Sequence, residues 1–104
     1  MPTYISLINW TDQGIRSVKD TLERSGRVAE DAQKKYGARF EQIYWTVGPY
    51  DIIAILEAPD EESATALLLE DASQGNIRTT TLRAYDREEM RGIIERLGGS
   101  SPGS

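Results

Sequence analysis

Residues 41–59 read EQIYWTVGPYDIIAILEAP, and this stretch decides the fold. Apolar and polar residues alternate over 41–47, which is typical of a β-strand because successive side chains point to opposite faces. Gly48 and Pro49 suit a turn, since glycine accepts a positive φ and proline has a fixed φ. The run 52–56, IIAIL, is rich in β-branched residues and predicts a second strand. We therefore expect a hairpin.

The second strand of this hairpin has no polar face, because its isoleucines fall on both sides of the run 52–56. A strand with one solvated face should instead alternate between apolar and polar residues. Segment 3–10, TYISLINW, has the same two-sided character, so we expect both segments to be central strands. The chain is too short to cover both faces with its own helices, and a second copy is the simplest cover. This predicts a homodimer or higher homo-oligomer formed through the sheet face; the alternative is a central strand that is merely apolar.

The first long connection between strands has apolar residues at helical spacing. Residues 12–24 are expected to form a short, irregular helical segment. A regular helix should then run over about 26–36, with Ser25 as its N-cap and Gly37 closing it. A single longer helix is the alternative.

Asp60 is expected to cap a second main helix that Gly75 ends. The inner stripe of this helix is apolar except at its last position: Ala64, Leu67, Leu68 and Asp71. The acids Asp60, Glu61, Glu62, Glu70 and Asp71 are read as a solvated helix surface.

The last part of the chain predicts an edge strand and a closing helix. Segment 76–85, NIRTTTLRAY, has the polar and charged residues that suit an edge. Asp86 and Glu89 have the spacing of a capping box for a helix that ends at Leu97. Its apolar stripe is a core or interface face: Met90, Ile93, Ile94 and Leu97.

The order of these elements defines the expected fold class. It is α+β, a ferredoxin-like βαββαβ arrangement with a four-stranded antiparallel sheet and an extra C-terminal helix. Residues 1–97 are expected to form a single domain. Residues 98–104, GGSSPGS, are expected to be a flexible tail.

Composition excludes several classes of function. The net charge of −5 argues against a nucleic-acid surface, and no apolar segment reaches the roughly 20 residues of a membrane span. Histidine and cysteine are both absent, which excludes Cys/His zinc sites, a His-dependent catalytic triad and a haem held by histidine. We expect no metal and no cofactor. No signal peptide is visible, and the cytoplasm is the expected compartment.

The segments TVGPYDIIAILEAPDEESA and GNIRTTTLRAY resemble the GYD-domain family, as does the earlier TDQGIRSVKD. The Gly-Tyr-Asp motif that names this family is met here as Gly48, Tyr50 and Asp51, with Pro49 inserted. The resemblance covers about residues 3–86. It implies a ferredoxin-like domain of the dimeric α/β-barrel type, in which two sheets face each other. It carries no established activity.

Six side chains are candidates for contact with a small organic ligand: Asn9, Trp10, Tyr44, Tyr50, Asp51 and Arg83. Each also has a structural interpretation. Asp51 suits backbone hydrogen bonds at the turn, the aromatic residues suit packing, and Arg83 suits an ion pair with Glu57.

Three functions compete. The first is a homo-oligomeric small-molecule-binding or accessory domain. The second is a cofactor-independent enzyme, similar to monooxygenases and isomerases of this superfold, which requires Asn9, Trp10 and Tyr44 or Tyr50 to converge around a pocket between sheet and helices. The third is an effector-binding regulatory domain, which usually needs a DNA-binding segment that this sequence does not contain.

Overall fold

Four antiparallel strands form one sheet in the computed structural model, which describes residues 1–98. The elements in chain order are β1 (Thr3–Trp10), α1 (Asp12–Arg16), a 3-10 turn η1 (Val18–Asp20), α2 (Thr21–Tyr36), β2 (Arg39–Trp45), β3 (Ile52–Glu57), α3 (Glu61–Ser73), β4 (Ile77–Ala84) and α4 (Arg87–Glu95). The strand order is β2-β3-β1-β4, with every neighbouring pair antiparallel. The predicted ferredoxin-like fold is confirmed, with β1 and β3 central and β4 at an edge.

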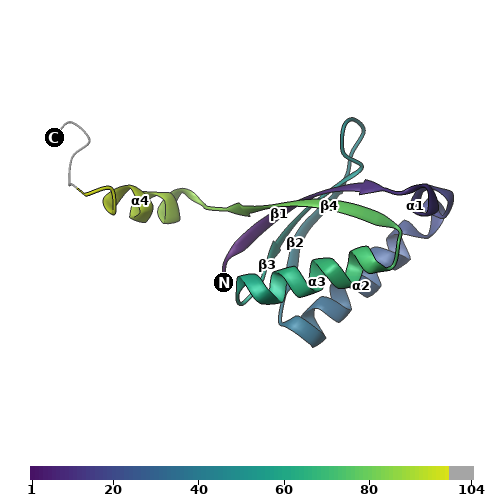
Figure 1. Cartoon of the computed structure of the whole chain (residues 1–104), viewed down its shortest axis with the longest axis horizontal. Helices are drawn as coiled ribbons and strands as arrows, with labels where there is room; N and C mark the ends of the chain where they lie inside the picture. The colour runs from purple at the N-terminus through teal and green to yellow at the C-terminus, as the bar shows by residue number, and fades with distance from the viewer. Residues whose placement is uncertain (99–104) are drawn as a thin grey trace.

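Helices α2 and α3 lie together against one face of the sheet (Figure 1). The alternate residues of the central strands that face these helices are each at most 7% exposed: Tyr4, Ser6, Ile8, Ile52, Ala54 and Leu56. The buried hydroxyl of Ser6 shares a 3.1 Å hydrogen bond with Thr81 Oγ1, so this polar atom is satisfied inside the core. Period-two alternation along β1 and β3 thus supplies the sheet side of the core.

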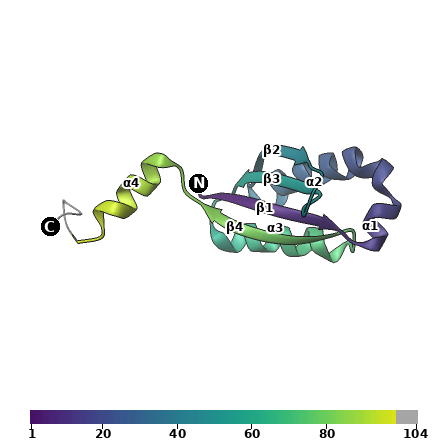
Figure 2. The ribbon, with the colours of Figure 1, turned by 90° about the horizontal axis from the view of Figure 1, so that it is seen from above.

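The other face of the sheet, which we call the open face, has none of the helices of residues 1–98 over it (Figure 2). Strand register places Ile5 opposite Ile55 and Leu7 opposite Ile53, and Leu82 lies beside Ile5 on β4. These five side chains form an apolar surface, and Leu82 is 48% exposed. The two-sided apolar pattern of the central strands is therefore real, and residues 1–98 cover only one side of it.

The predicted hairpin joins β2 to β3 through residues 46–51, which rise above the open face (Figure 1). The pairing starts at Trp45 and Ile52 and is shifted by an irregularity between Phe40 and Gln42. Thr46 N donates to Asp51 O at 2.8 Å and closes the loop.

Helix α2 begins at Thr21, so the expected start at about residue 26 is wrong. The side chain of Ser25 donates to Leu22 O at 3.0 Å and caps nothing. Gly26 lies inside the helix, where its cost of about 1 kcal/mol relative to alanine does not outweigh continuous hydrogen bonding. The end of the helix agrees with the prediction, since Gly37 adopts a φ of 64°.

The caps of the two later helices follow the sequence. Asp60 accepts a 2.7 Å hydrogen bond from Ser63 N, and Asp86 forms a complete capping box with Glu89. Helix α4 nevertheless projects away from the sheet (Figure 1). Of its apolar stripe, Met90 and Ile94 are each 46% exposed and Leu97 is 79% exposed, so the stripe is not part of this chain's core. Of the expected tail, 98–104, all but Gly98 lies outside the described residues.

A substitution of Gly14 tests the contact between α1 and the loop before β4. A Cβ atom at this buried position would lie 1.9 Å from the backbone oxygen of Asn76. That oxygen also accepts from Thr11 N at 3.0 Å. Gly14→Ala should therefore lower the free energy of unfolding by about 2–3 kcal/mol or more, as measured by urea denaturation.

Gly26→Ala is the matched control, because a Cβ atom there meets nothing within 4 Å. It should stabilise the protein by up to about 1 kcal/mol. Equal stability of the two variants would contradict the close approach at Gly14.

Candidate functional site

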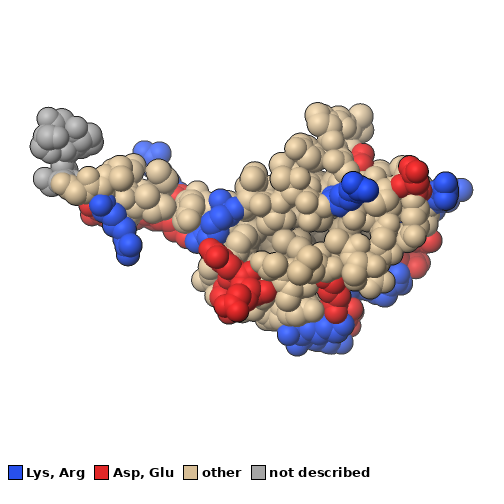
Figure 3. Space-filling model, in the orientation of Figure 1, with Lys and Arg blue, Asp and Glu red and all other residues tan. Residues whose placement is uncertain are grey.

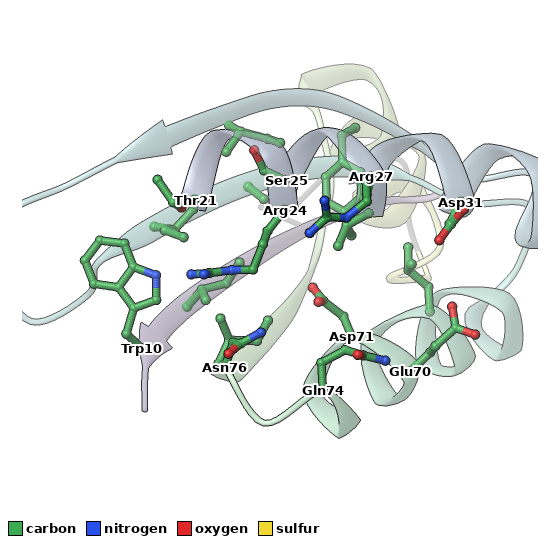
Figure 4. Close-up of a pocket in the computed structure, with 18 of the residues that line it drawn as sticks. Trp10, Thr21, Arg24, Ser25, Arg27, Asp31, Glu70, Asp71, Gln74 and Asn76 are labelled. Atoms are coloured by element: carbon green, nitrogen blue, oxygen red, sulfur yellow. The ribbon is translucent and has the colours of Figure 1, made fainter. Parts of the chain in front are cut away.

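A cavity of about 310 Å³ lies between the sheet and helices α2 and α3 (Figure 4). Its floor is formed by apolar side chains of the strands: Ile8, Phe40, Ile43, Ile52, Ala54 and Ile77. Its walls come from α2, from α3 and from the loop that follows α3, and apart from Val28 and Leu67 they are polar: Thr21, Arg24, Ser25, Arg27, Asp31, Lys35, Glu70, Asp71, Gln74 and Asn76. The space therefore offers an apolar surface on one side and charged groups on the other.

Trp10 closes one end of the cavity. Figure 4 shows its indole nitrogen directed toward the side chain of Arg24. This nitrogen is buried and has no hydrogen-bond acceptor within the described residues. A buried donor left without a partner costs about 1–3 kcal/mol. A ligand oxygen that accepts a hydrogen bond from this nitrogen would therefore contribute more binding free energy than one at a donor that already has a partner.

Arg24 is held in place mainly by Ser17, which lies between α1 and η1. Its Nη1 donates to the backbone oxygen and the side-chain oxygen of Ser17, at 2.7 and 2.8 Å. Its Nη2 has only a long contact of 3.4 Å to Gly14 O. The guanidinium is thus fixed in position while part of its donor capacity faces the cavity (Figure 4).

Asp71 is the most perturbed ionisable group of the cavity. Burial raises the pKa of its carboxyl from 3.8 to about 6, against an opposing effect of Arg24, and the charge of Glu70 raises it further. Figure 4 shows the carboxylate extending from α3 into the space below α2. A carboxylate held in a cavity without a salt bridge is available to bind a donor or a cation.

Of the six candidate residues, only Trp10 lines the cavity. Asn9 and Tyr44 lie on the opposite face of the sheet, because they pair in register with Arg78 and Ile53. The convergence of Asn9, Trp10 and Tyr44 that the enzyme alternative requires is therefore absent. Tyr50 belongs to the hairpin loop, and its backbone oxygen accepts from Thr46 Oγ1 at 2.6 Å.

Asp51 ties the hairpin loop to the end of β1. Its Oδ2 accepts a 2.9 Å hydrogen bond from the backbone nitrogen of Trp10, and its own nitrogen donates to Ile8 O at 2.8 Å. These contacts place the carboxylate at the strand end and outside the cavity lining.

Arg83 lies at the other end of the sheet from Trp10. Its guanidinium stacks 4.3 Å from the centre of the Tyr85 ring, donates to Thr3 O at 3.2 Å and lies 3.7 Å from Glu89. The expected partner, Glu57, pairs instead with Arg39 at 3.1 Å. Arg83 thus joins β4 to the start of α4.

The sequence interpretation missed Asp71 and Arg24. Asp71 was assigned to a solvated surface, although it occupies the last position of the α3 stripe that also carries Ala64 and Leu67. Both of these are buried, at 2% exposure each. An acid in register with buried residues was the available signal. Arg24 had no comparable signal, because its position depends on the turn between α1 and α2.

The open face and α4 form a second candidate surface. Figure 3 shows that charged side chains gather along the helices and at the ends of the domain, while the upper surface, on the sheet side, is mostly uncharged. The open face itself carries the five apolar side chains named above, and an exposed apolar surface usually marks an interface.

Within residues 1–98, no three acidic side chains are grouped so that they could hold a metal ion. No helix of this region is both long and apolar enough to span a membrane.

Two comparisons with known proteins place the chain. A family model described as GYD domain matches residues 4–94. The chain is also 34% identical over 84 residues to a protein of Thermus thermophilus named "glutamine synthetase and cystathionine beta-lyase binding protein". This alignment covers 81% of the chain and 88% of the relative. The family match includes all the residues that line the cavity.

The raised pKa of Asp71 predicts a pH-dependent stability change. Because the pKa is raised in the folded state, ionisation of Asp71 opposes folding above about pH 6, and this penalty disappears as the pH falls toward 3.8. Asp71→Asn should therefore raise the free energy of unfolding by about 2 kcal/mol at alkaline pH and by much less in acid. Urea denaturation across this range measures the difference, and a pH-independent difference would contradict it.

The tie made by Asp51 is tested by a pair of substitutions. Asp51→Ala removes the acceptor for Trp10 N and should lower the free energy of unfolding by about 1–2 kcal/mol. Asp51→Asn keeps an oxygen at the same place and should cost clearly less. Denaturation midpoints compare the two, and an unchanged midpoint in the alanine variant would rule out the structural role.

Proposed function

The chain belongs to the GYD domain family, and we propose that it is a homo-oligomeric accessory protein that binds other molecules. The observation that carries this proposal is the open face, an apolar sheet surface that no helix of residues 1–98 covers. A second copy placed on this face would bury the same residues from both sides, as a two-fold interface requires. Two sheets that face each other in this way would form the dimeric α/β-barrel arrangement that the family resemblance implies.

Helix α4 supports the same proposal. Its apolar stripe is exposed, yet its N-terminus is fixed by the capping box and by the stacked Arg83. An amphipathic helix gains most of its stability by packing its apolar face against another element. We infer that α4 packs on a neighbouring copy, which would extend the interface beyond the sheet.

The binding role extends to protein partners. The relative from Thermus thermophilus is named as a protein that binds two enzymes. An accessory role of the same general kind suits this chain, whose open face and α4 offer apolar surface and whose family offers no established activity. The cavity on the other side of the sheet would hold a small organic molecule, since its volume falls at the lower end of the range of ligand pockets, about 300–1,000 Å³.

Self-association is tested by placing a charge on the open face. Leu82→Glu introduces a carboxylate at an edge-strand position that is 48% exposed, so the fold should tolerate it. The native protein should sediment as a dimer or larger at micromolar concentration. The Leu82→Glu variant should shift to monomer because a buried unpaired charge is costly.

Leu22→Glu is the control, since Leu22 is 69% exposed on α2 and lies away from the open face. It should keep the mass of the native assembly. A native protein that sediments as a monomer, or equal loss of assembly in both variants, would overturn the proposal.

A further inference from the structure

We propose that the cavity binds a free α-amino acid with an apolar side chain, an inference that rests on the proposed small-molecule role of the cavity. Three features of the cavity each fit one part of such a ligand. They are a group of hydrogen-bond donors at one end, an acid in the polar wall and an apolar floor.

The donors gather around Trp10. The indole Nε1–H has no acceptor among the described residues, and the Nη2 of Arg24 makes only the 3.4 Å contact with Gly14 O. Asn76 joins them, because its Oδ1 is already used as an acceptor from Gln13 Nε2 at 2.9 Å, which leaves its Nδ2 hydrogens to donate. Converging donors with a fixed guanidinium suit a carboxylate, whose two oxygens accept several hydrogen bonds.

Two of the three acids in the lining, Asp31 and Asp71, form no salt bridge within the described residues, whereas Glu70 is paired with Lys35 at 3.1 Å. Asp31 is exposed and Asp71 is partly buried, so Asp71 is the acid that gains more from a bound cation. A bound ammonium group would compensate the charge that burial disfavours. Since Figure 4 shows Asp71 on the wall across from α2 and Asn76 between it and Trp10, the donors and the acceptor border one continuous space.

The charge of the lining also favours a zwitterion. Arg24, Arg27 and Lys35 are balanced by three acids, Asp31, Glu70 and Asp71. A simple organic anion would meet these acids, and a simple amine would meet the cations. A zwitterion has both charges and no net charge, so its carboxylate can contact the cations while its ammonium group contacts the acids.

The apolar floor supplies the surface for the ligand's side chain. Ile8 and Ile52 are each 7% exposed and Ala54 is 1% exposed, so this part of the floor is largely shielded from solvent. The volume of about 310 Å³ accommodates a molecule the size of leucine, methionine or phenylalanine, and it is small for a nucleotide.

Isothermal titration calorimetry on the full chain tests the proposal with matched ligands. L-Leucine carries both charged groups, 4-methylpentanoate lacks the amine, and 3-methylbutylamine lacks the carboxylate. Leucine should bind at least about tenfold more tightly than either fragment, because each fragment loses one charge-assisted contact.

Two variants assign the contacts. Trp10→Phe keeps an aromatic ring and removes the N–H. It should weaken the binding of leucine and of 4-methylpentanoate by about tenfold each. Asp71→Asn should weaken leucine binding by a similar factor, and it should leave the affinity for 4-methylpentanoate nearly unchanged or slightly higher. Tyr44→Phe, on the open face, is the control and should change neither affinity. Circular dichroism verifies folding of each variant.

The outcomes separate the ligand class from the proposed function. If 4-methylpentanoate binds as tightly as leucine, the amino-acid assignment is overturned while the cavity remains a small-molecule site. If none of the three compounds binds to folded protein at millimolar concentration, the amino-acid assignment is also overturned. The proposed self-association is tested separately, by sedimentation. Leucine binding that is weakened by about tenfold in both cavity variants and unchanged in Tyr44→Phe supports the proposal.

Discussion

One helix layer covers a sheet that is apolar on both faces, and the rest of the structure follows from this constraint. The central strands β1 and β3 direct alternate side chains toward α2 and α3, where they are buried. The remaining side chains of the same strands form the open face, which the chain cannot bury with its described elements because α4 projects away from the sheet. Burial of apolar area contributes about 25 cal/mol per Å². Covering the open face with a second layer would therefore stabilise this protein more than it would stabilise one whose outer strand residues are polar.

The cavity results from uneven filling beneath the helix layer. One cluster of buried residues, which includes Tyr4, Leu56 and Leu67, fills the space near the start of β1. Toward the end of β1 the sheet contributes Ile8, Ile52 and Ala54, and the helices contribute mainly polar side chains. Protein interiors are normally close-packed, so a hollow of this size beside a carboxylate that opposes folding is a cost to stability. Such costs are characteristic of sites kept for function.

Much of the fold could be predicted because its signals are local. Alternation in residues 41–59 and 3–10, the turn residues and the caps at Asp60 and Asp86 each depend on a few neighbouring positions. The start of α2 was misplaced because Ser25 and Gly26 are weak breaks that tertiary packing overrides. The site was harder. Trp10 was identified, but Asp71 and Arg24 meet it only through the packing of α1, α2 and α3, which residues distant in sequence determine.

The projection of α4 has a hydrodynamic consequence. The described chain has a radius of gyration of 16.3 Å and a longest dimension of 56 Å, whereas a compact domain of 100 residues has a radius of about 13 Å. A single copy would therefore elute from a sizing column as though it were heavier than 11.6 kDa. If α4 folds onto a neighbouring copy, a dimer becomes compact for its mass, and the two species approach each other in elution volume. The retention time of this protein is thus a poor measure of the number of copies in its assembly. The mass has to be measured by light scattering or by sedimentation equilibrium.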